Sequence, residues 1–153
     1  MVANSGFLLT KVEYIKNNEE KKFVIVDSGM NDLIRPALYQ SYHDIVPAIK
    51  KKQEKDVSET SGKGNVDIVG PICESSDFLG KNRHLEGVEV GDILVVKSCG
   101  AYGFVMSSNY NTRGRAAEII VDGNTAKIVR KRETLDDLLY LESTFDKAPS
   151  SDL

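Results

Sequence analysis

The stretch from Gly70 to Gly80 concentrates groups that could do chemistry. It reads Gly-Pro-Ile-Cys-Glu-Ser-Ser-Asp-Phe-Leu-Gly, which places a thiol, two carboxylates and two hydroxyls among residues typical of turns. Loops bounded by glycine and proline hold polar groups at the surface, where they can meet a ligand. In such a loop Cys73 can donate a proton and Glu74 can anchor a charged group. The alternative for a single cysteine is a small buried residue, so this interpretation depends on its context.

Arg35 and Tyr39 form a second candidate group. They lie about one helical turn apart, so a short helix would present a guanidinium and a hydroxyl on one side. A guanidinium matches a carboxylate in a bidentate way. The alternative is a solvated arginine beside a packed tyrosine. Tyr102, within Gly100-Ala101-Tyr102-Gly103, could line a phosphate site, although this glycine spacing is also typical of a plain loop.

The other reactive side chains indicate structure rather than chemistry. Cys99 follows an apolar strand pattern, which predicts a buried and inert thiol, and two cysteines are too few for a disulfide scaffold. His43 and His84 lack metal-ligand spacing, so we predict no metal site and place both at the surface. The serine pairs have no nucleophile-elbow pattern, which argues against serine hydrolysis.

Strands and turns must position these groups, because the chain shows little helical periodicity. Strands are predicted over residues 7–15, 23–26, 66–69, 93–96, 104–106, 116–121 and 126–130. The continuously apolar run at 93–96 favours burial on both faces. Short helices are predicted from Pro36, because proline suits a first turn, and after Thr134, which forms a capping-box pattern with Asp137. These elements predict a mainly β fold, a small barrel or sandwich.

Composition bounds the possible functions. With 153 residues, 41% of them hydrophobic, the chain suits one domain, predicted over 1–142, with a polar loop at 50–65 and a disordered tail at 143–153. Twenty basic against 23 acidic residues leave a net charge of −3 and no basic stripe, which argues against nucleic acid as a partner. No apolar run has membrane-spanning length and no signal pattern follows Met1, so the expected location is cytoplasmic, with no membrane partner.

Three blocks of the sequence, residues 27–39, 70–79 and 100–111, resemble the diaminopimelate decarboxylase family, in the family's order. The similarity runs from about Val2 to Glu142. Members are pyridoxal-phosphate enzymes of the alanine racemase and ornithine decarboxylase type, fold type III, in which a TIM-like barrel precedes a β-barrel. They convert meso-2,6-diaminopimelate to L-lysine and CO₂, the last step of lysine biosynthesis. This chain resembles only the second part, which implies a Greek-key-like β-barrel with two short helices.

The resemblance also implies a role for each candidate residue. Arg35 and Tyr39 match residues that hold the distal carboxylate of the substrate, and Tyr102 matches one that touches both the cofactor phosphate and the substrate. Cys73 matches the proton donor and Glu74 the acid that binds the distal amine, a pair that reaches across a homodimer interface.

The substrate class follows from charge. Arg35 suits a substrate that keeps a carboxylate at its distal end and would repel ornithine or lysine, whose distal group is an amine alone. Relatives that act on those substrates also tend to carry aspartate after the cysteine, where this chain has Glu74. Diaminopimelate is therefore the expected substrate.

The departures from the family limit these expectations. The TIM-like barrel, its Schiff-base lysine and its glycine-rich phosphate loop have no counterpart in this sequence. We therefore expect the chain to be inactive alone and to need pyridoxal 5'-phosphate together with a barrel domain or a second decarboxylase subunit. The alternative is a non-catalytic β-domain or interaction module that pairs with an intact subunit. The family's β-domain also borrows N-terminal strand material, so an unfilled sheet edge and a tendency to associate are expected.

Overall fold

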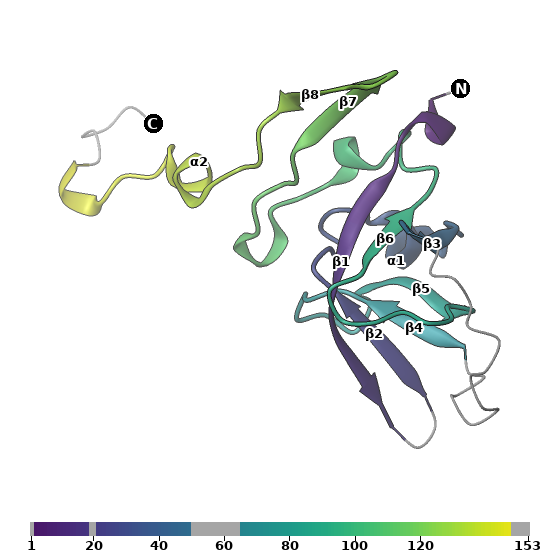
Figure 1. Cartoon of the computed structure of the whole chain (residues 1–153). Helices are drawn as coiled ribbons and strands as arrows, with labels where there is room; N and C mark the ends of the chain where they lie inside the picture. Colours follow the sequence, from purple (N-terminus) through teal and green to yellow (C-terminus); the bar gives the residue numbers. More distant parts are fainter. Residues whose placement is uncertain (1, 19–20, 50–64, 148–153) are drawn as a thin grey trace. The chain divides into compact units, whose positions relative to one another are not determined.

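A computed structural model describes residues 2–18, 21–49 and 65–147 (Figure 1). The chain divides into two compact units, Met1–Asn111 and Thr112–Leu153, and each is described by itself. That both belong to one domain over 1–142 stays a prediction. The predicted polar loop lies outside the described residues except for Asn65, as do residues 148–153 of the predicted tail. Within the described part of that tail, Phe145–Lys147 forms a 3-10 turn, η4.

A six-stranded sheet dominates the first unit. Its strands are β1 (Leu8–Asn17), β2 (Lys22–Val26), β3 (Ile45–Pro47), β4 (Val66–Val69), β5 (Phe78–Arg83) and β6 (Ile93–Val96), in the order β3-β6-β1-β2-β4-β5. The β2–β4 pair is parallel and the other pairs are antiparallel. Figure 1 shows the sheet curled into a half barrel. This confirms the predicted mainly β fold with two short α-helices.

The long strand β1 lets the sheet curl. Its first half, Leu8 to Lys11, pairs with β6, while the residues from Val12 onward pair with β2. The β1–β2 register shifts between Val12 and Tyr14. An irregularity of this kind bends a strand and increases its twist, so one strand can serve both arms of the curl.

The hydrophobic core lies against one face of this sheet. Its buried members are Val12, Val24, Val26, Leu33, Ile45, Val66, Ile68, Leu79, Leu85, Val88, Leu94 and Val96. In β6, Leu94 and Val96 are buried, whereas Ile93 is 40% exposed. The prediction that β6 is buried on both faces is therefore wrong, because successive side chains of a strand alternate between its two faces and only Leu94 and Val96 belong to the core.

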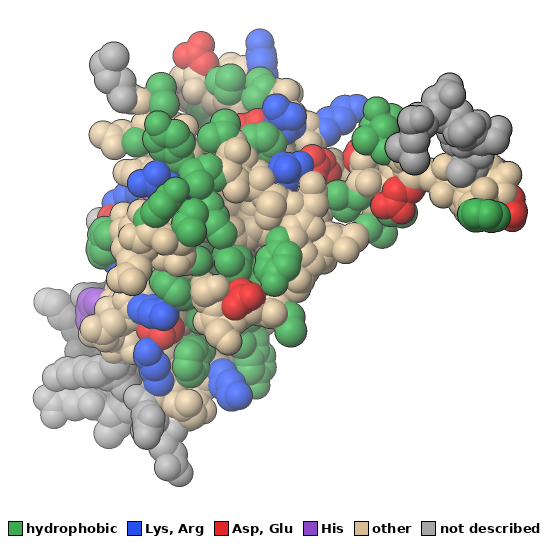
Figure 2. Space-filling view, turned by 180° about the vertical axis from the view of Figure 1, so that it is seen from behind, with side chains coloured by type: hydrophobic (Ala, Val, Ile, Leu, Met, Phe, Trp, Pro, Cys, Tyr) green, Lys and Arg blue, Asp and Glu red, His purple; other side chains and the backbone are tan. Residues whose placement is uncertain are grey.

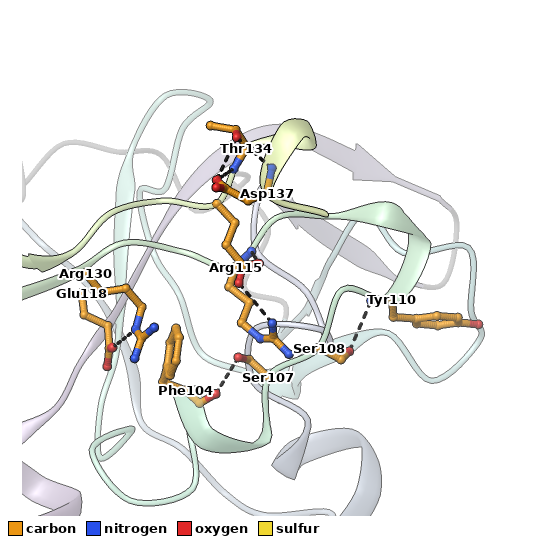
Figure 3. Close-up of polar contacts among 10 residues, drawn as sticks. Phe104, Ser107, Ser108, Tyr110, Arg115, Glu118, Arg130, Thr134 and Asp137 are labelled. Atoms are coloured by element: carbon orange, nitrogen blue, oxygen red, sulfur yellow. Dashed lines mark hydrogen bonds and ion pairs between the residues drawn. The ribbon is translucent and has the colours of Figure 1, made fainter. Parts of the chain in front are cut away.

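The strands β3 and β5 were not predicted from the sequence, and one segment predicted as a strand is a 3-10 helix. β3 contains Pro47, a residue unsuited to a central strand, but β3 is an edge strand and proline is tolerated there. β5 begins inside the stretch that was assigned to a loop. The strand predicted at 104–106 is wrong, because this segment is a 3-10 helix, η2 (Phe104–Met106). The backbone N–H of Ser107 donates to the Phe104 carbonyl, and the Ser107 hydroxyl donates to the same oxygen (Figure 3).

The first unit also contains the helix that carries the candidate arginine. α1 (Arg35–Tyr39) has Pro36 in its first turn and ends at Gln40 in the left-handed region, with φ of 55°. Two further 3-10 helices are η1 (Ala3–Ser5) and η3 (Tyr110–Thr112).

The second unit is a hairpin followed by a helix. β7 (Glu118–Asp122) and β8 (Thr125–Arg130) are antiparallel and turn at Gly123, whose φ of 55° suits glycine. α2 (Leu135–Leu139) has the predicted capping box between Thr134 and Asp137 (Figure 3). Both predictions are confirmed. No described residue of this unit is buried. Figure 2 shows exposed hydrophobic side chains in green, and those of large apolar residues in this unit belong to Ile119, Ile120, Val121, Ile128, Val129, Leu135, Leu139, Tyr140, Leu141 and Phe145.

Candidate functional site

The three blocks singled out in the sequence meet around residues 29–33, between β2 and α1. From the second block, the Asp77 carboxylate accepts a hydrogen bond from the Met30 backbone N–H at 2.7 Å. From the third block, the Ser108 backbone N–H donates to the Asn31 carbonyl at 2.8 Å. Positions far apart in the sequence are thus fixed to the segment that leads directly into Arg35.

Arg35 lies beside Tyr39, the predicted partner, and also beside Tyr102. Its guanidinium carbon is 5.5 Å from the ring centroid of Tyr102 and 5.8 Å from that of Tyr39, which is cation–π range. Arg35 itself is half-buried, while both tyrosines are exposed. The structure therefore brings Arg35, Tyr39 and Tyr102 together, and their roles in binding stay predictions.

A hollow opens beside Arg35, here called the arginine pocket. It has a volume of about 310 Å³ and is lined by Ala3, Arg35, Ser41, Tyr42, His43, Ser98, Ala101 and Tyr102. Its polar side chains include a guanidinium and several hydroxyls, a set of donors that suits a carboxylate or a phosphate. Ser98 and Tyr102 have φ of 60° and 59°, a left-handed conformation that is costly for such residues and clusters at functional sites.

His43 lies in the wall of this pocket and not at the surface, so that prediction is wrong. It is only 4% exposed, because it lies two residues before the buried Ile45 that starts β3, whereas Asp44 between them is exposed. Its Nδ1 is 2.9 Å from the Lys97 carbonyl oxygen, which can only accept, so Nδ1 carries a proton. Its Nε2 has no hydrogen-bond partner among the described residues. His84, in contrast, is exposed as predicted.

Cys99 lies near the pocket as a partly buried thiol. Its Sγ is 3.3 Å from the Val96 carbonyl oxygen. Burial raises the pKa of Cys99 to about 11. The thiol therefore stays protonated at neutral pH, which supports the prediction that Cys99 is inert.

Cys73 and Glu74 stand at the exposed tip of residues 70–80, here called the cysteine loop. Short-range backbone bonds shape the tip, from Glu74 N–H to the Ile72 carbonyl at 2.8 Å and from Asp77 N–H to the Glu74 carbonyl at 3.0 Å. The Tyr110 hydroxyl lies 3.5 Å from Glu74 Oε2 and can donate to it. Cys73 is a free thiol. The loop thus exposes a thiol and a carboxylate.

The sequence analysis missed the residue that anchors this loop. Asp77 is 5% exposed, and its two oxygens accept from the backbone N–H groups of Met30 and Ile72. The available signal was its position directly before an apolar strand start, because a carboxylate there must find partners inside the protein.

The structure divides the predicted site residues into two groups. Arg35 and Tyr102 line the arginine pocket, with the Tyr39 ring beside Arg35, and Cys73 and Glu74 belong to the cysteine loop. Among the described residues, no hydrogen bond, ion pair or ring contact joins one group directly to the other. The connection between them runs through Asp77 and residues 29–33.

Other kinds of site were also considered. In the part of the chain that the structure describes, no three His, Cys, Asp or Glu side chains are grouped so as to hold a metal ion. Over the same ranges, every helix is too short or too polar to cross a membrane.

Comparison with known proteins gives the family. The model of the C-terminal sheet domain of pyridoxal-dependent decarboxylases matches residues 2–100. The diaminopimelate decarboxylase of Pseudomonas fluorescens is 57% identical over 94% of this chain and 32% of its own length, and that of Vibrio cholerae is 54% identical with the same coverage. The chain thus spans about a third of the length of these curated relatives.

Solved structures agree. A diaminopimelate decarboxylase from M. jannaschii in complex with L-lysine superimposes with a TM-score of 0.82 at 41% identity, over 93% of this chain and 31% of that one. Lysine decarboxylase from Selenomonas ruminantium, with a TM-score of 0.58 at 22% identity, covers 72% of this chain and 27% of its own and shares the fold alone. The chain belongs to the C-terminal sheet domain family of the pyridoxal-dependent decarboxylases.

Proposed function

We propose that this chain supplies the C-terminal β-domain of a pyridoxal-phosphate-dependent diaminopimelate decarboxylase, which converts meso-2,6-diaminopimelate to L-lysine and CO₂. The observation that carries the proposal is the seating of Arg35 against Tyr39 and Tyr102 at an open pocket. Activity then requires a barrel domain, on the same chain or on a partner subunit of a homodimer, because a chain spanning a third of its relatives' length supplies only part of the site.

The arginine pocket selects the substrate in this proposal. The guanidinium of Arg35 pairs with the distal carboxylate, and Tyr39 adds a hydroxyl at the rim. A fixed cation facing the distal end favours a substrate that carries a carboxylate there and disfavours one that ends in an amine alone. This supports diaminopimelate over lysine or ornithine.

The cysteine loop completes the reaction. Glu74 pairs with the distal amine and holds the substrate, while Cys73 delivers the proton that replaces the departing carboxylate. The carbon–carboxylate bond breaks, CO₂ leaves, and the thiol proton is transferred to the carbon. The resulting thiolate regains a proton from solvent. Because both side chains are exposed at a loop tip, they can reach into a site on another polypeptide.

Pyridoxal 5'-phosphate supplies the electron sink for this bond cleavage when bound. The residues on this chain fit a phosphate contact, because Ser98 and Tyr102 line one pocket with hydroxyl donors suited to an oxyanion. Tyr102 is the residue that we assign to the phosphate. Its hydroxyl would hold the phosphate group, and the barrel domain would supply the remaining contacts.

The test is CO₂ release from meso-diaminopimelate with added pyridoxal phosphate. The chain is assayed alone, mixed with a separately produced barrel domain from a relative, and fused to that domain. We expect activity in the mixture or the fusion and none from the chain alone. A folded fusion without activity would overturn the proposal and favour a non-catalytic interaction module.

A further inference from the structure

Asp77 is a buried carboxylate that the proposed chemistry leaves unused. It lies at the base of the cysteine loop, four residues after Cys73, and is 5% exposed. A carboxylate in such a place must be satisfied by hydrogen bonds, because burial penalises an uncompensated charge. The hydrogen-bond partners of Asp77 therefore indicate which segments it holds together.

Each oxygen of Asp77 serves a different segment. Oδ1 accepts from the backbone N–H of Met30 at 2.7 Å, and Oδ2 accepts from that of Ile72 at 2.6 Å. Met30 lies 47 positions before Asp77, whereas Ile72 lies 5 positions before it. One carboxylate thus bridges the cysteine loop and the turn that leads into α1.

Two glycines make this bridge possible. A Cβ built at Gly70 would lie 2.5 Å from Asp77 Oδ2 and 2.6 Å from the Gly29 Cα. A Cβ at Gly29 would lie 2.9 Å from Asp77 Oδ1 and also 2.9 Å from an Ile72 side-chain carbon. The two backbones therefore approach more closely than any side chain allows, and the carboxylate fills the space between them.

The bridge joins the two halves of the proposed site. Ile72 directly precedes Cys73, and Met30 opens the turn from which α1 presents Arg35 five residues later. We propose that Asp77 is a positioning residue that fixes the cysteine loop relative to the arginine pocket and so sets where Cys73 is presented. The catalytic consequence rests on the proposed function, while the clamp itself does not.

The clamp is tested first on this chain by amide hydrogen exchange, without any activity assay. In the unmodified chain we expect the Met30 and Ile72 amides to be protected, and the amide of exposed Ser75 to exchange much faster. In Asp77→Asn one acceptor becomes a donor of the same size, so exchange at Met30 and Ile72 should accelerate by about 10-fold or more, with the core amides of Val24 and Leu94 nearly unchanged.

Asp122→Asn is the matched control, because this exposed aspartate at the β7–β8 turn tolerates asparagine. It should leave every exchange rate in the first unit unchanged. Unaltered exchange at Met30 and Ile72 in Asp77→Asn would overturn the clamp. If that variant does not fold, the unmodified chain decides, since unprotected Met30 and Ile72 amides would overturn it equally.

The catalytic consequence is tested in the active fusion by a double-mutant cycle. Asp77→Asn should lower kcat by about 10-fold or more, and should cost little further in a Cys73→Ala background, because its effect passes through that thiol. An equal loss in both backgrounds would mean a general structural role and would overturn the positioning of Cys73. An inactive fusion would instead count against the proposed function and leave the exchange test to decide the clamp.

Discussion

In the arginine pocket the polar groups line a hollow, whereas in the cysteine loop they stand at an exposed tip. Arg35 is half-buried between two rings, and its surroundings are fixed by α1 and the turn before η2. Cys73 and Glu74 are exposed, and what is buried is their anchor, Asp77. Under the proposed function, the first region receives a ligand and the second enters the site of a partner.

This difference indicates which residues must be held rigid if two polypeptides share one site, as the proposed function requires. A receiving pocket orders the groups that touch the ligand, through packing around them. A projecting loop must leave its tip uncovered if the tip is to enter a partner. The contacts that keep the loop rigid therefore have to lie at its base. Hydrogen bonds buried at the base meet that need without covering the reactive groups.

Loss of the loop's proton donor should have the largest effect. In the active fusion, Cys73→Ala is expected to lower kcat by about 100-fold or more with a smaller change in KM, since general acid catalysis contributes 10²–10⁴-fold. Cys99→Ser is the matched thiol control and should retain activity. Unchanged turnover in Cys73→Ala would remove the loop from the chemistry.

Loss of the Arg35 guanidinium should have the next largest effect, and this effect should fall on substrate binding and not on turnover. Arg35→Gln is expected to lower kcat/KM for diaminopimelate by about 10–100-fold, because a charged hydrogen bond contributes about 1.5–3 kcal/mol. The variant should also discriminate less against lysine as a substrate. Arg132→Gln, exposed after β8, is the matched control. Equal kinetics in both variants would break the assignment of Arg35 to substrate selection.

The reactivities of Cys73 and Cys99 test the comparison between the two regions without an activity assay. At pH 8, iodoacetamide should alkylate exposed Cys73 about 10-fold or more faster than Cys99, which is partly buried and has a pKa raised to about 11. Because burial disfavours the Cys99 thiolate, its alkylation rate should keep rising as the pH approaches 11. Mass spectrometry of the labelled peptides measures both rates. Comparable rates at pH 8 would contradict the exposed-tip description.

The smallest effect is expected outside both regions. Hydrogen bonds from the backbone and hydroxyl of Thr134 lower the pKa of the Asp137 carboxyl. Because the folded-state pKa lies below its ordinary value of 3.8, this group stabilises α2 above that pH and ceases to do so as the pH falls through the folded pKa. Thr134→Ala should reduce α2 helicity in NMR chemical shifts and leave Cys73 alkylation unchanged. A changed alkylation rate would show that the second unit influences the loop.

Local sequence signals predicted much of the fold. The hairpin turn at Gly123, the capping box at Thr134 and the short helix containing Pro36 depend on neighbouring residues, and each is found. The burial pattern of β6 and the environment of His43 depend on what packs against them, and both were predicted wrongly. Pro47 shows the same limit, because only the sheet order reveals that its strand lies at an edge.

The sequence by itself determined which chemical groups are present, a thiol beside a carboxylate and an arginine one turn before a tyrosine. Only the tertiary structure decided how they divide, with Arg35 beside Tyr102 and Cys73 apart from both. It also gave Asp77 its place, since the bond to Met30 spans 47 positions. Such contacts form when sheet and core bring distant segments together, and nothing in the residues adjacent to Asp77 specifies Met30 as its partner.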